Sequence, residues 1–337
     1  MKRILPLFLL FALILTGCGG TAGSTPLMPT AAAATLAPVE QSKAVQAAQQ
    51  YGGEVARPLI RDLTNSGPRV AGSEAEARTA QYITSVFQAI GYTPETQPFN
   101  AKAGDKNIAS ANVVAIKAGS SAQEIIVGAH YDSVEGAPGA DDNASGVAVM
   151  LEVAKLIQNN PSLYTIRFIA FGAGEAGQAG SYAYLNQMNQ EEFENTIAMI
   201  NLNSLVAGDI AYVYGDEDQQ SVVRDWALEW ALGNGFDLQT IRNVDLTVGG
   251  KGSSDYAPFR DAGIPYAYFQ AANWNLGDKK GSEQVDTRFG DHGVIRQTKF
   301  DTLAYLDDNF PGRVDERLNL FISIVFNLLT QYEAPIK

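Results

Sequence analysis

The stretch IIVGAHYDSVEGAPGADDNASGVAVMLEVA, residues 125–154, carries an apolar run, a polar loop and a helical pattern in immediate succession. The run Glu124–His130 is nearly continuous in apolar residues, which is typical of a strand buried on both faces of a sheet. From Val147 to Ala154, apolar residues recur at i, i+3, i+4 and i+7 and predict a helix that covers the sheet. The loop between them therefore follows the carboxyl end of a strand, where α/β proteins place functional residues.

Other short apolar runs alternate with longer helical patterns along the chain. They predict five more strands, at Asn112–Lys117, Tyr164–Phe171, Ile197–Leu202, Ile210–Tyr214 and Tyr266–Gln270. A last helix is predicted between Val314 and Leu329, where apolar residues recur on one side. This alternation favours a single α/β domain over residues 41–337, with a mixed, mainly parallel sheet and helices on both faces.

The composition is that of a globular protein with one large core, because 46% of the 337 residues are hydrophobic and 18% are charged. The formal net charge of −13 argues against nucleic acid or an anionic membrane surface as a partner, since both carry phosphates that repel acidic proteins. Acidic excess is also common in secreted bacterial proteins, so solubility explains the charge equally well.

The N-terminus is typical of a processing segment rather than of the folded domain. Lys2 and Arg3 precede the apolar run Ile4–Leu15, which is too short to span a bilayer as a stable helix. We therefore predict a signal peptide at residues 1–17 and export of the remaining chain.

The segment Leu15–Cys18 resembles the bacterial lipobox, in which the cysteine is lipidated and becomes the mature N-terminus. Cys18 is the only cysteine of the chain, so no internal disulfide is available to an exported protein. Residues 18–40 are rich in Gly, Ala, Thr and Pro and are predicted to form a flexible tether. The lipid would anchor the protein to the cell envelope, on its periplasmic or extracellular face.

Most polar motifs of the chain follow a predicted strand or enter a helix. Beside the opening stretch they are FGAGEAGQAGS at 171–181, AMINLNSL at 198–205, SSDYAPFRDAGIPYAYF at 253–269 and RQTKFDTLAYLD at 296–307. Together the motifs resemble the bacterial di-zinc aminopeptidase family, peptidase family M28, over roughly residues 55–335. The resemblance implies a zinc aminopeptidase-like fold and a metal site that acts on peptides.

The resemblance assigns His130 as a ligand of the first zinc ion, Asp142 as the carboxylate that bridges two ions, and Glu175 as a ligand of the second. Asp132 can accept a hydrogen bond from the second ring nitrogen of His130 and so orient a metal-binding imidazole. Asp141 and Asp142 also permit a helix-start interpretation, because acidic residues and Asn143 before an apolar helix satisfy free backbone N–H groups. One of the two side chains would then cap the helix while the other faces the site.

Three positions depart from the family pattern. Gly174 stands where the family has the glutamate that acts as general base, Asn203 replaces an aspartate ligand of the first ion, and Gln297 replaces a histidine ligand of the second. His292, the other histidine of the chain, is either a replacement ligand or a solvated loop residue. Apart from its lost base, Gly174 can be interpreted as a turn residue that needs an unusual backbone angle.

The remaining ligands limit the metal that the site can hold. Two carboxylates, Asp142 and Glu175, and one imidazole, His130, remain beside neutral amides. Zinc takes three or four nitrogen, sulfur or carboxylate donors, so we expect one zinc ion at most or none. Amide oxygens suit a harder divalent cation better than zinc.

The sequence thus predicts a catalytically silent or strongly impaired aminopeptidase-like domain that binds a peptide or protein through its cleft. Loss of a positioned general base lowers a rate by about 100- to 10,000-fold. The alternative is an active metallo-aminopeptidase that removes N-terminal residues with an unusual metal site. The long loop Gln270–Gly293 is the candidate for contact with a substrate or partner.

Overall fold

The computed structural model describes residues 55–216, 221–242, 254–277 and 279–334. The predicted signal peptide, Cys18, the tether and the first residues of the predicted domain lie outside these ranges. Among the helices that are described, none combines the length and the apolar character needed to cross a membrane.

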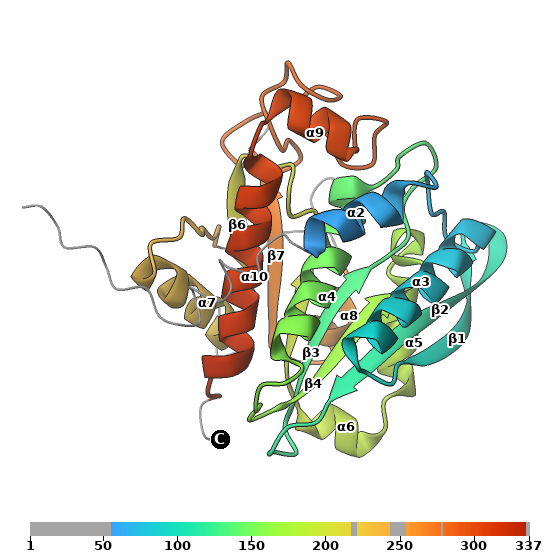
Figure 1. Ribbon diagram of the computed structural model, residues 1–337, viewed down its shortest axis with the longest axis vertical. Coiled ribbons are helices and arrows are strands. Elements are labelled where there is room, and N and C mark those ends of the chain that lie inside the picture. Colours follow the sequence, from blue (N-terminus) through green and yellow to red (C-terminus); the bar gives the residue numbers. More distant parts are fainter. Residues whose placement is uncertain (1–54, 217–220, 243–253, 278, 335–337) are drawn as a thin grey trace, which may run out of the picture. The chain divides into compact units, whose positions relative to one another are not determined.

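The described residues form a sheet of seven strands in the order β1-β2-β4-β3-β5-β7-β6 (Figure 1). The strands are β1 (Glu95–Ala103), β2 (Lys106–Lys117), β3 (Glu124–His130), β4 (Thr165–Phe171), β5 (Thr196–Leu202), β6 (Ile210–Tyr214) and β7 (Tyr266–Ala272). Strands β4, β3, β5 and β7 are parallel, whereas β1, β2 and β6 join antiparallel at the two edges. The predicted mixed, mainly parallel sheet is confirmed.

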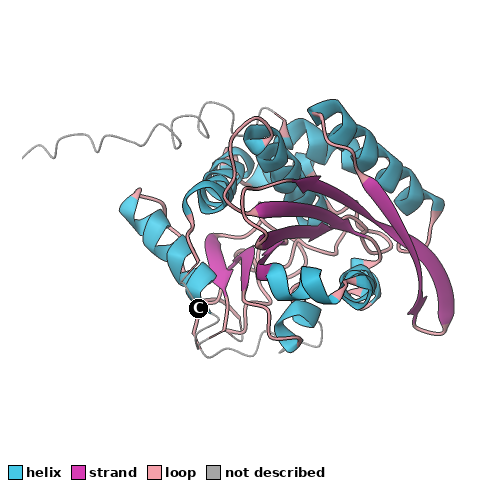
Figure 2. Cartoon of the chain, turned by 90° about the horizontal axis from the view of Figure 1, so that it is seen from below, coloured by secondary structure: helices cyan, strands magenta, loops and turns pink. Residues whose placement is uncertain are grey.

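Helices cover both faces of this sheet, as predicted (Figures 1 and 2). One side carries α2 (Ala56–Thr64), α3 (Glu74–Ile90), α4 (Gly146–Ile157), α7 (Val222–Gly233) and α10 (Arg313–Gln331). The other side carries α5 (Ala179–Gln187), α6 (Gln190–Asn195) and α8 (Ala257–Asp261), while α9 (Leu303–Asn309) packs on α10. The predicted helices around 147–154 and 314–329 are the cores of α4 and α10.

Two hydrophobic cores follow from the two-residue period of the strands. On β4, Phe168 packs in the core beneath α3 and α4, whereas its neighbour Ile169 packs in the core on the opposite face. Because helices cover both faces of the sheet, the central strands are apolar at nearly every position. This explains why these strands could be predicted from the sequence. Strand β1 was not predicted, since its burial alternates and much of it is exposed.

The parallel strands bring three polar segments to one edge of the sheet. Strand β3 ends at His130, β4 ends just before the short turn of 3₁₀ helix at Gly174–Ala176, and β5 ends just before Asn203. The turn Ala140–Ser145 enters α4 at the same place. Because β4, β3 and β5 are adjacent, residues that are distant in sequence meet here.

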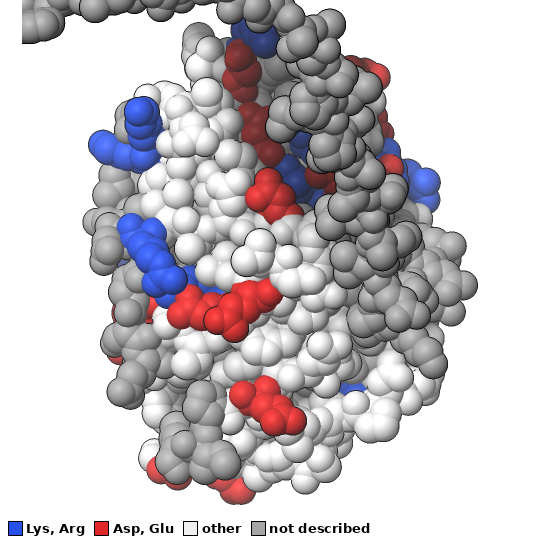
Figure 3. Space-filling model, turned by 90° about the vertical axis from the view of Figure 1, so that its left-hand side faces the viewer, with Lys and Arg blue, Asp and Glu red and all other residues white. Residues whose placement is uncertain are grey.

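Charged side chains on the face shown in Figure 3 lie in small groups of either sign among uncharged residues. On the visible part of that face, the net charge of −13 is therefore not gathered in one large acidic patch.

Candidate metal centre and active site

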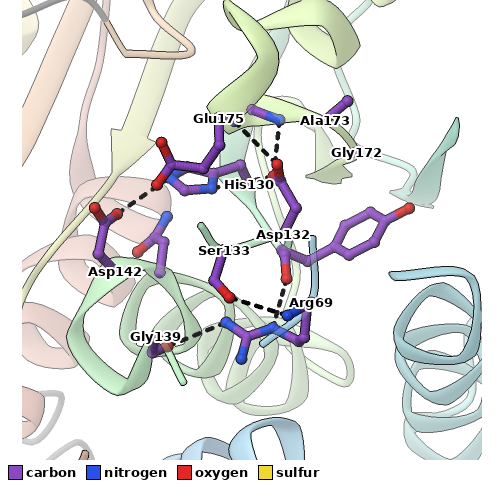
Figure 4. A network of polar contacts seen from close by, with 12 residues as sticks. Arg69, His130, Asp132, Ser133, Gly139, Asp142, Gly172, Ala173 and Glu175 are labelled. Carbon is purple, nitrogen blue, oxygen red and sulfur yellow. Dashed lines mark hydrogen bonds and ion pairs between the residues drawn. The ribbon is translucent and has the colours of Figure 1, made fainter. Parts of the chain in front are cut away.

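His130, Asp142 and Glu175 converge on one point (Figure 4). Each offers one ligand atom, and these three atoms lie within 4.8 Å of one another. His130 and Asp142 are 6% and 3% exposed, and Glu175 is partly exposed. Each donor thus comes from a different segment: His130 from the end of β3, Asp142 from the turn before α4 and Glu175 from the turn after β4.

Asp132 connects two of these segments. Its Oδ1 lies 3.3 Å from Nδ1 of His130. The same carboxylate accepts hydrogen bonds from the backbone N–H groups of Gly174 at 2.7 Å and Glu175 at 3.0 Å. A fully buried carboxylate therefore contacts the imidazole ring and holds the turn that presents Glu175.

The face of His130 that points into the site meets two oxygen atoms. Its Nε2 lies 3.3 Å from Oδ1 of Asp142 and 2.7 Å from Oδ1 of Asn203. Burial disfavours the imidazolium, but the carboxylates of Asp132 and Asp142 outweigh burial and raise the pKa of His130 well above its usual value. For Asp142, burial acts to raise the pKa, and the contact with His130 turns the net change downward.

Glu175 is held by Gln297, whose Nε2 donates to both carboxylate oxygens at 2.9 and 2.8 Å. Burial, together with the charge of Asp142, raises the pKa of Glu175 to about 8. Gln297 thus places amide N–H groups against Glu175 rather than an oxygen donor toward a metal.

The donor set fits one divalent cation. One imidazole nitrogen and two carboxylates match the three protein ligands of a catalytic zinc site, which leaves one position for water or substrate. The carboxylates of Asp142 and the partly exposed Glu175 are unfavourable beside each other without a positive charge between them; burial and the charge of Asp142 both raise the pKa of Glu175. The amide side chains of Asn203 and Gln297 add no charge, so the described residues offer a second ion few donors.

Gly174, where the sequence predicts the position of the missing base, is packed against His130. A Cβ atom at residue 174 would lie 2.4 Å from Cβ of His130. The interpretation of Gly174 as a turn residue with an unusual backbone angle is wrong, because positive φ occurs instead at Ala173 (51°) and Gly177 (79°). Close approach of the backbone, rather than a left-handed conformation, requires glycine here.

Asp141 does not cap the helix that follows it, so that part of the helix-start interpretation is wrong. Its Oδ1 accepts hydrogen bonds from the N–H groups of Val206 and Ala207 at 2.8 and 2.9 Å. Gln284 donates to Oδ2 at 2.6 Å, which ties the long loop after β7 to the site. Asn143 instead satisfies the N–H of Gly146, at 3.0 Å, at the start of α4.

His292 lies away from the three donors. Its side chain is 93% exposed and its nearest carboxylate partner is Asp291, 4.0 Å away. The structure therefore places it as a solvated loop residue and does not bring it to the group formed by His130, Asp142 and Glu175.

Three buried charged residues that shape the site had no predicted role. Arg69 is 1% exposed and donates to the carbonyl oxygens of Tyr131 (2.7 Å) and Gly139 (3.1 Å), with burial lowering its pKa to about 10 (Figure 4). Glu76 accepts the N–H of Ala173 at 2.8 Å. Asp301 accepts the N–H groups of Asp141 and Asp142 at 2.5 and 3.1 Å. Asp301 lies in the motif at 296–307, whereas no motif near Arg69 or Glu76 in the sequence indicates their roles.

The fold and the group formed by His130, Asp142 and Glu175 are typical of the zinc aminopeptidase class. A family model described as peptidase family M28 matches residues 112–321. The structure of BSAP, a zinc aminopeptidase from Bacillus subtilis, superposes with a TM-score of 0.69 at 19% identity, over 84% of this chain and 97% of that one.

Curated relatives agree with this class. The chain is 31% identical over 321 residues to the alkaline phosphatase isozyme conversion protein of Escherichia coli K12, covering 85% of this chain and 92% of that protein. It is 31% identical over 219 residues to the probable lipoprotein aminopeptidase LpqL of Mycobacterium tuberculosis, covering 60% of this chain and 43% of LpqL. The chain belongs to peptidase family M28.

Proposed function

We propose that this protein is a strongly impaired metallo-aminopeptidase that holds one divalent ion and binds the N-terminal end of peptides. The observation that carries the proposal is the convergence of His130, Asp142 and Glu175 within 4.8 Å beside a glycine at the position of the general base. Peptides as the substrate class are supported by the printed names of LpqL, a probable lipoprotein aminopeptidase, and of BSAP, a zinc aminopeptidase.

His130, Asp142 and Glu175 are the residues that would hold the ion. When bound, the ion would polarise the scissile carbonyl and lower the pKa of a water molecule. Asp132 fixes the ring of His130, and Gln297 fixes the carboxylate of Glu175. The buried carboxylates Asp142 and Glu175 also favour a cationic ligand, and the α-ammonium group is the cation that every free peptide N-terminus carries.

Proton transfer is the weak step of this site. Gly174 cannot accept a proton, and a missing general base slows a reaction by about 100- to 10,000-fold. We therefore expect turnover that is measurable with high enzyme concentrations but far below that of a complete family member.

Turnover of leucyl amide and of N-acetyl-leucyl amide by the purified full-length chain tests the proposal. We expect slow release of ammonia from the free amine substrate, none from the acetylated one, and loss of activity in Glu175→Ala. Glu191→Ala, an exposed change on α6, is the matched control and should keep the activity. Equal hydrolysis of both substrates, or turnover that survives Glu175→Ala, would reject the assignment.

A second candidate is binding without hydrolysis. The contact between Gly174 and His130 favours it, because a side chain at residue 174 would collide with the side chain of His130. Calorimetry that detects peptide binding, combined with an absence of product after prolonged incubation, would select this function over slow catalysis. Zinc, magnesium and manganese should be compared, since the amide oxygen of Asn203 suits a harder cation better than zinc.

We also propose the envelope localisation that the N-terminal sequence predicts. Residues 1–17 would be removed, Cys18 would carry the lipid and residues 18–40 would tether the domain that begins near residue 41. The similarity to a probable lipoprotein supports this arrangement. Metabolic labelling with a radioactive fatty acid should mark the wild type and not Cys18→Ser; equal labelling of both would refute it.

A further inference from the structure

A cavity of about 530 Å³ lies next to the metal residues and opens to solvent. Glu175 belongs both to the metal group and to the wall of this cavity. The remaining wall comes from residues 70–71, from 102–104 at the tip of the β1–β2 hairpin, from 133–135 and from 176–177. Its volume lies within the range of roughly 300–1,000 Å³ that is typical of ligand sites.

The walls of the cavity are mainly apolar. Val70, Ala71, Ala103, Val134 and Ala176 contribute carbon-rich surfaces. Lys102 and Glu135 add one charge of each sign at exposed positions, so these two residues give the rim no net charge. An uncharged, apolar group of aromatic or branched size therefore fits this chemistry better than an ionic one.

The two sides of the metal group differ in access. On the side of His130, the described side chains of Asp142, Asn203 and Tyr268 are buried, at 3%, 8% and 5% exposure. The cavity on the side of Glu175 is open. An enzyme that removes one N-terminal residue needs a closed end for that residue and an open end through which the rest of the peptide continues.

We propose that this cavity binds the apolar side chain of the residue that follows the scissile bond. The tip of the β1–β2 hairpin, where Ala103 lines the cavity, then determines which side chains fit at this position of the peptide. This inference rests on the proposed function, because it places the peptide by its contact with the metal residues.

The test compares leucyl-phenylalanine amide with leucyl-glycine amide, using the full-length protein and the ratio of their kcat/KM values. We expect the wild type to prefer the phenylalanine peptide by about tenfold, the usual effect of an apolar side-chain pocket. Ala103→Phe should fill the cavity and lower the ratio about tenfold, and Ala71→Phe, from another loop, should do the same. Ala109→Phe is the matched control, because Ala109 is exposed on the same hairpin but lies outside the wall.

The outcomes separate this inference from the proposed function. A ratio near one in the wild type, with both peptides hydrolysed, would overturn the cavity assignment while leaving the aminopeptidase proposal standing. An equal loss of preference in Ala109→Phe would also overturn it. If neither the two peptides nor leucyl amide is hydrolysed or bound, the proposed function fails and the cavity assignment fails with it.

Discussion

The backbone of Gly174 lies against His130 so closely that a Cβ atom at residue 174 would come within 2.4 Å of Cβ and 2.6 Å of Cγ of the imidazole side chain. A side chain at residue 174 and the imidazole of His130 therefore cannot both be accommodated in this arrangement. If residue 174 is the position of the general base, as we propose, a single reverse substitution should not restore that base.

Gly174→Glu should therefore fail to raise the turnover of leucyl amide, because the new side chain must displace His130 or the turn. Gly174→Ala should lower the free energy of unfolding by about 1–3 kcal/mol, the usual cost of overpacking. Urea denaturation measures this change, and Gly233→Ala is the control, since no atom lies within 4 Å of its added Cβ. A Gly174→Glu protein with wild-type stability and restored turnover would contradict the account.

Asp132→Ala should weaken zinc binding by about 10- to 100-fold, because it removes the partner that orients His130. It also leaves the N–H groups of Gly174 and Glu175 without their acceptor, at a cost of about 1–3 kcal/mol each. Competition with a zinc chelator measures the affinity. Asp132→Asn keeps one oxygen acceptor, so its zinc affinity should lie between those of the wild type and Asp132→Ala. An unchanged zinc affinity in both variants would rule out the orienting role of Asp132.

Restoring the two family ligands should restore the second ion. Asn203→Asp adds a carboxylate where Oδ1 already lies 2.7 Å from Nε2 of His130, and Gln297→His adds an imidazole beside Glu175. Histidine tolerates the positive φ of 58° at residue 297 better than most residues. The double variant should bind about two zinc ions per chain by mass spectrometry, and Gln297→Asn with Asn203→Asp should not. If the double variant still binds one zinc ion per chain, the neutral amides of Asn203 and Gln297 are not the reason for the missing second ion.

Stability should depend on pH through Glu76. Burial, together with the charge of Asp132, raises the pKa of Glu76 above its ordinary value of 4.5. The folded chain then holds this proton more tightly than the unfolded chain, so the free energy of unfolding falls as pH rises from 4.5 through the folded-state pKa.

Glu76→Gln, which does not titrate, should flatten that part of the profile, even though it lowers stability because one amide oxygen replaces the two oxygens that accept the N–H groups of Ala173 and Gly72. Denaturation at several pH values measures the slope. Glu74→Gln, on the same helix with a side chain 95% exposed, should keep the wild-type slope. Identical slopes in all three proteins would show that Glu76 does not titrate as described.

The parallel core of the fold was predictable because each of its strands is buried on both faces and therefore apolar throughout. Strand β1 escaped prediction because only one of its faces is partly covered, and that face carries Gln97, Phe99 and two alanines rather than branched apolar residues. The hairpin that it forms with β2 borders the cavity beside Glu175.

The site was predictable where a motif follows a strand, as for His130 and Glu175. The contacts of Arg69 and Glu76 were not, because they join segments that are distant in sequence: Glu76 lies 97 residues before its partner Ala173. Local patterns carry no information on such pairings. The steric reason for Gly174 likewise depends on β3 and β4 lying side by side.

The central claim, one divalent ion held by His130, Asp142 and Glu175, is tested most directly by the metal-to-protein ratio of the purified full-length chain. The protein is dialysed against micromolar zinc and measured by mass spectrometry, beside Glu175→Ala and the exposed control Glu191→Ala. We predict about one zinc ion per chain in the wild type and in Glu191→Ala, and a clear loss in Glu175→Ala. No bound zinc in the wild type, two ions per chain, or a ratio unaffected by Glu175→Ala would contradict the account.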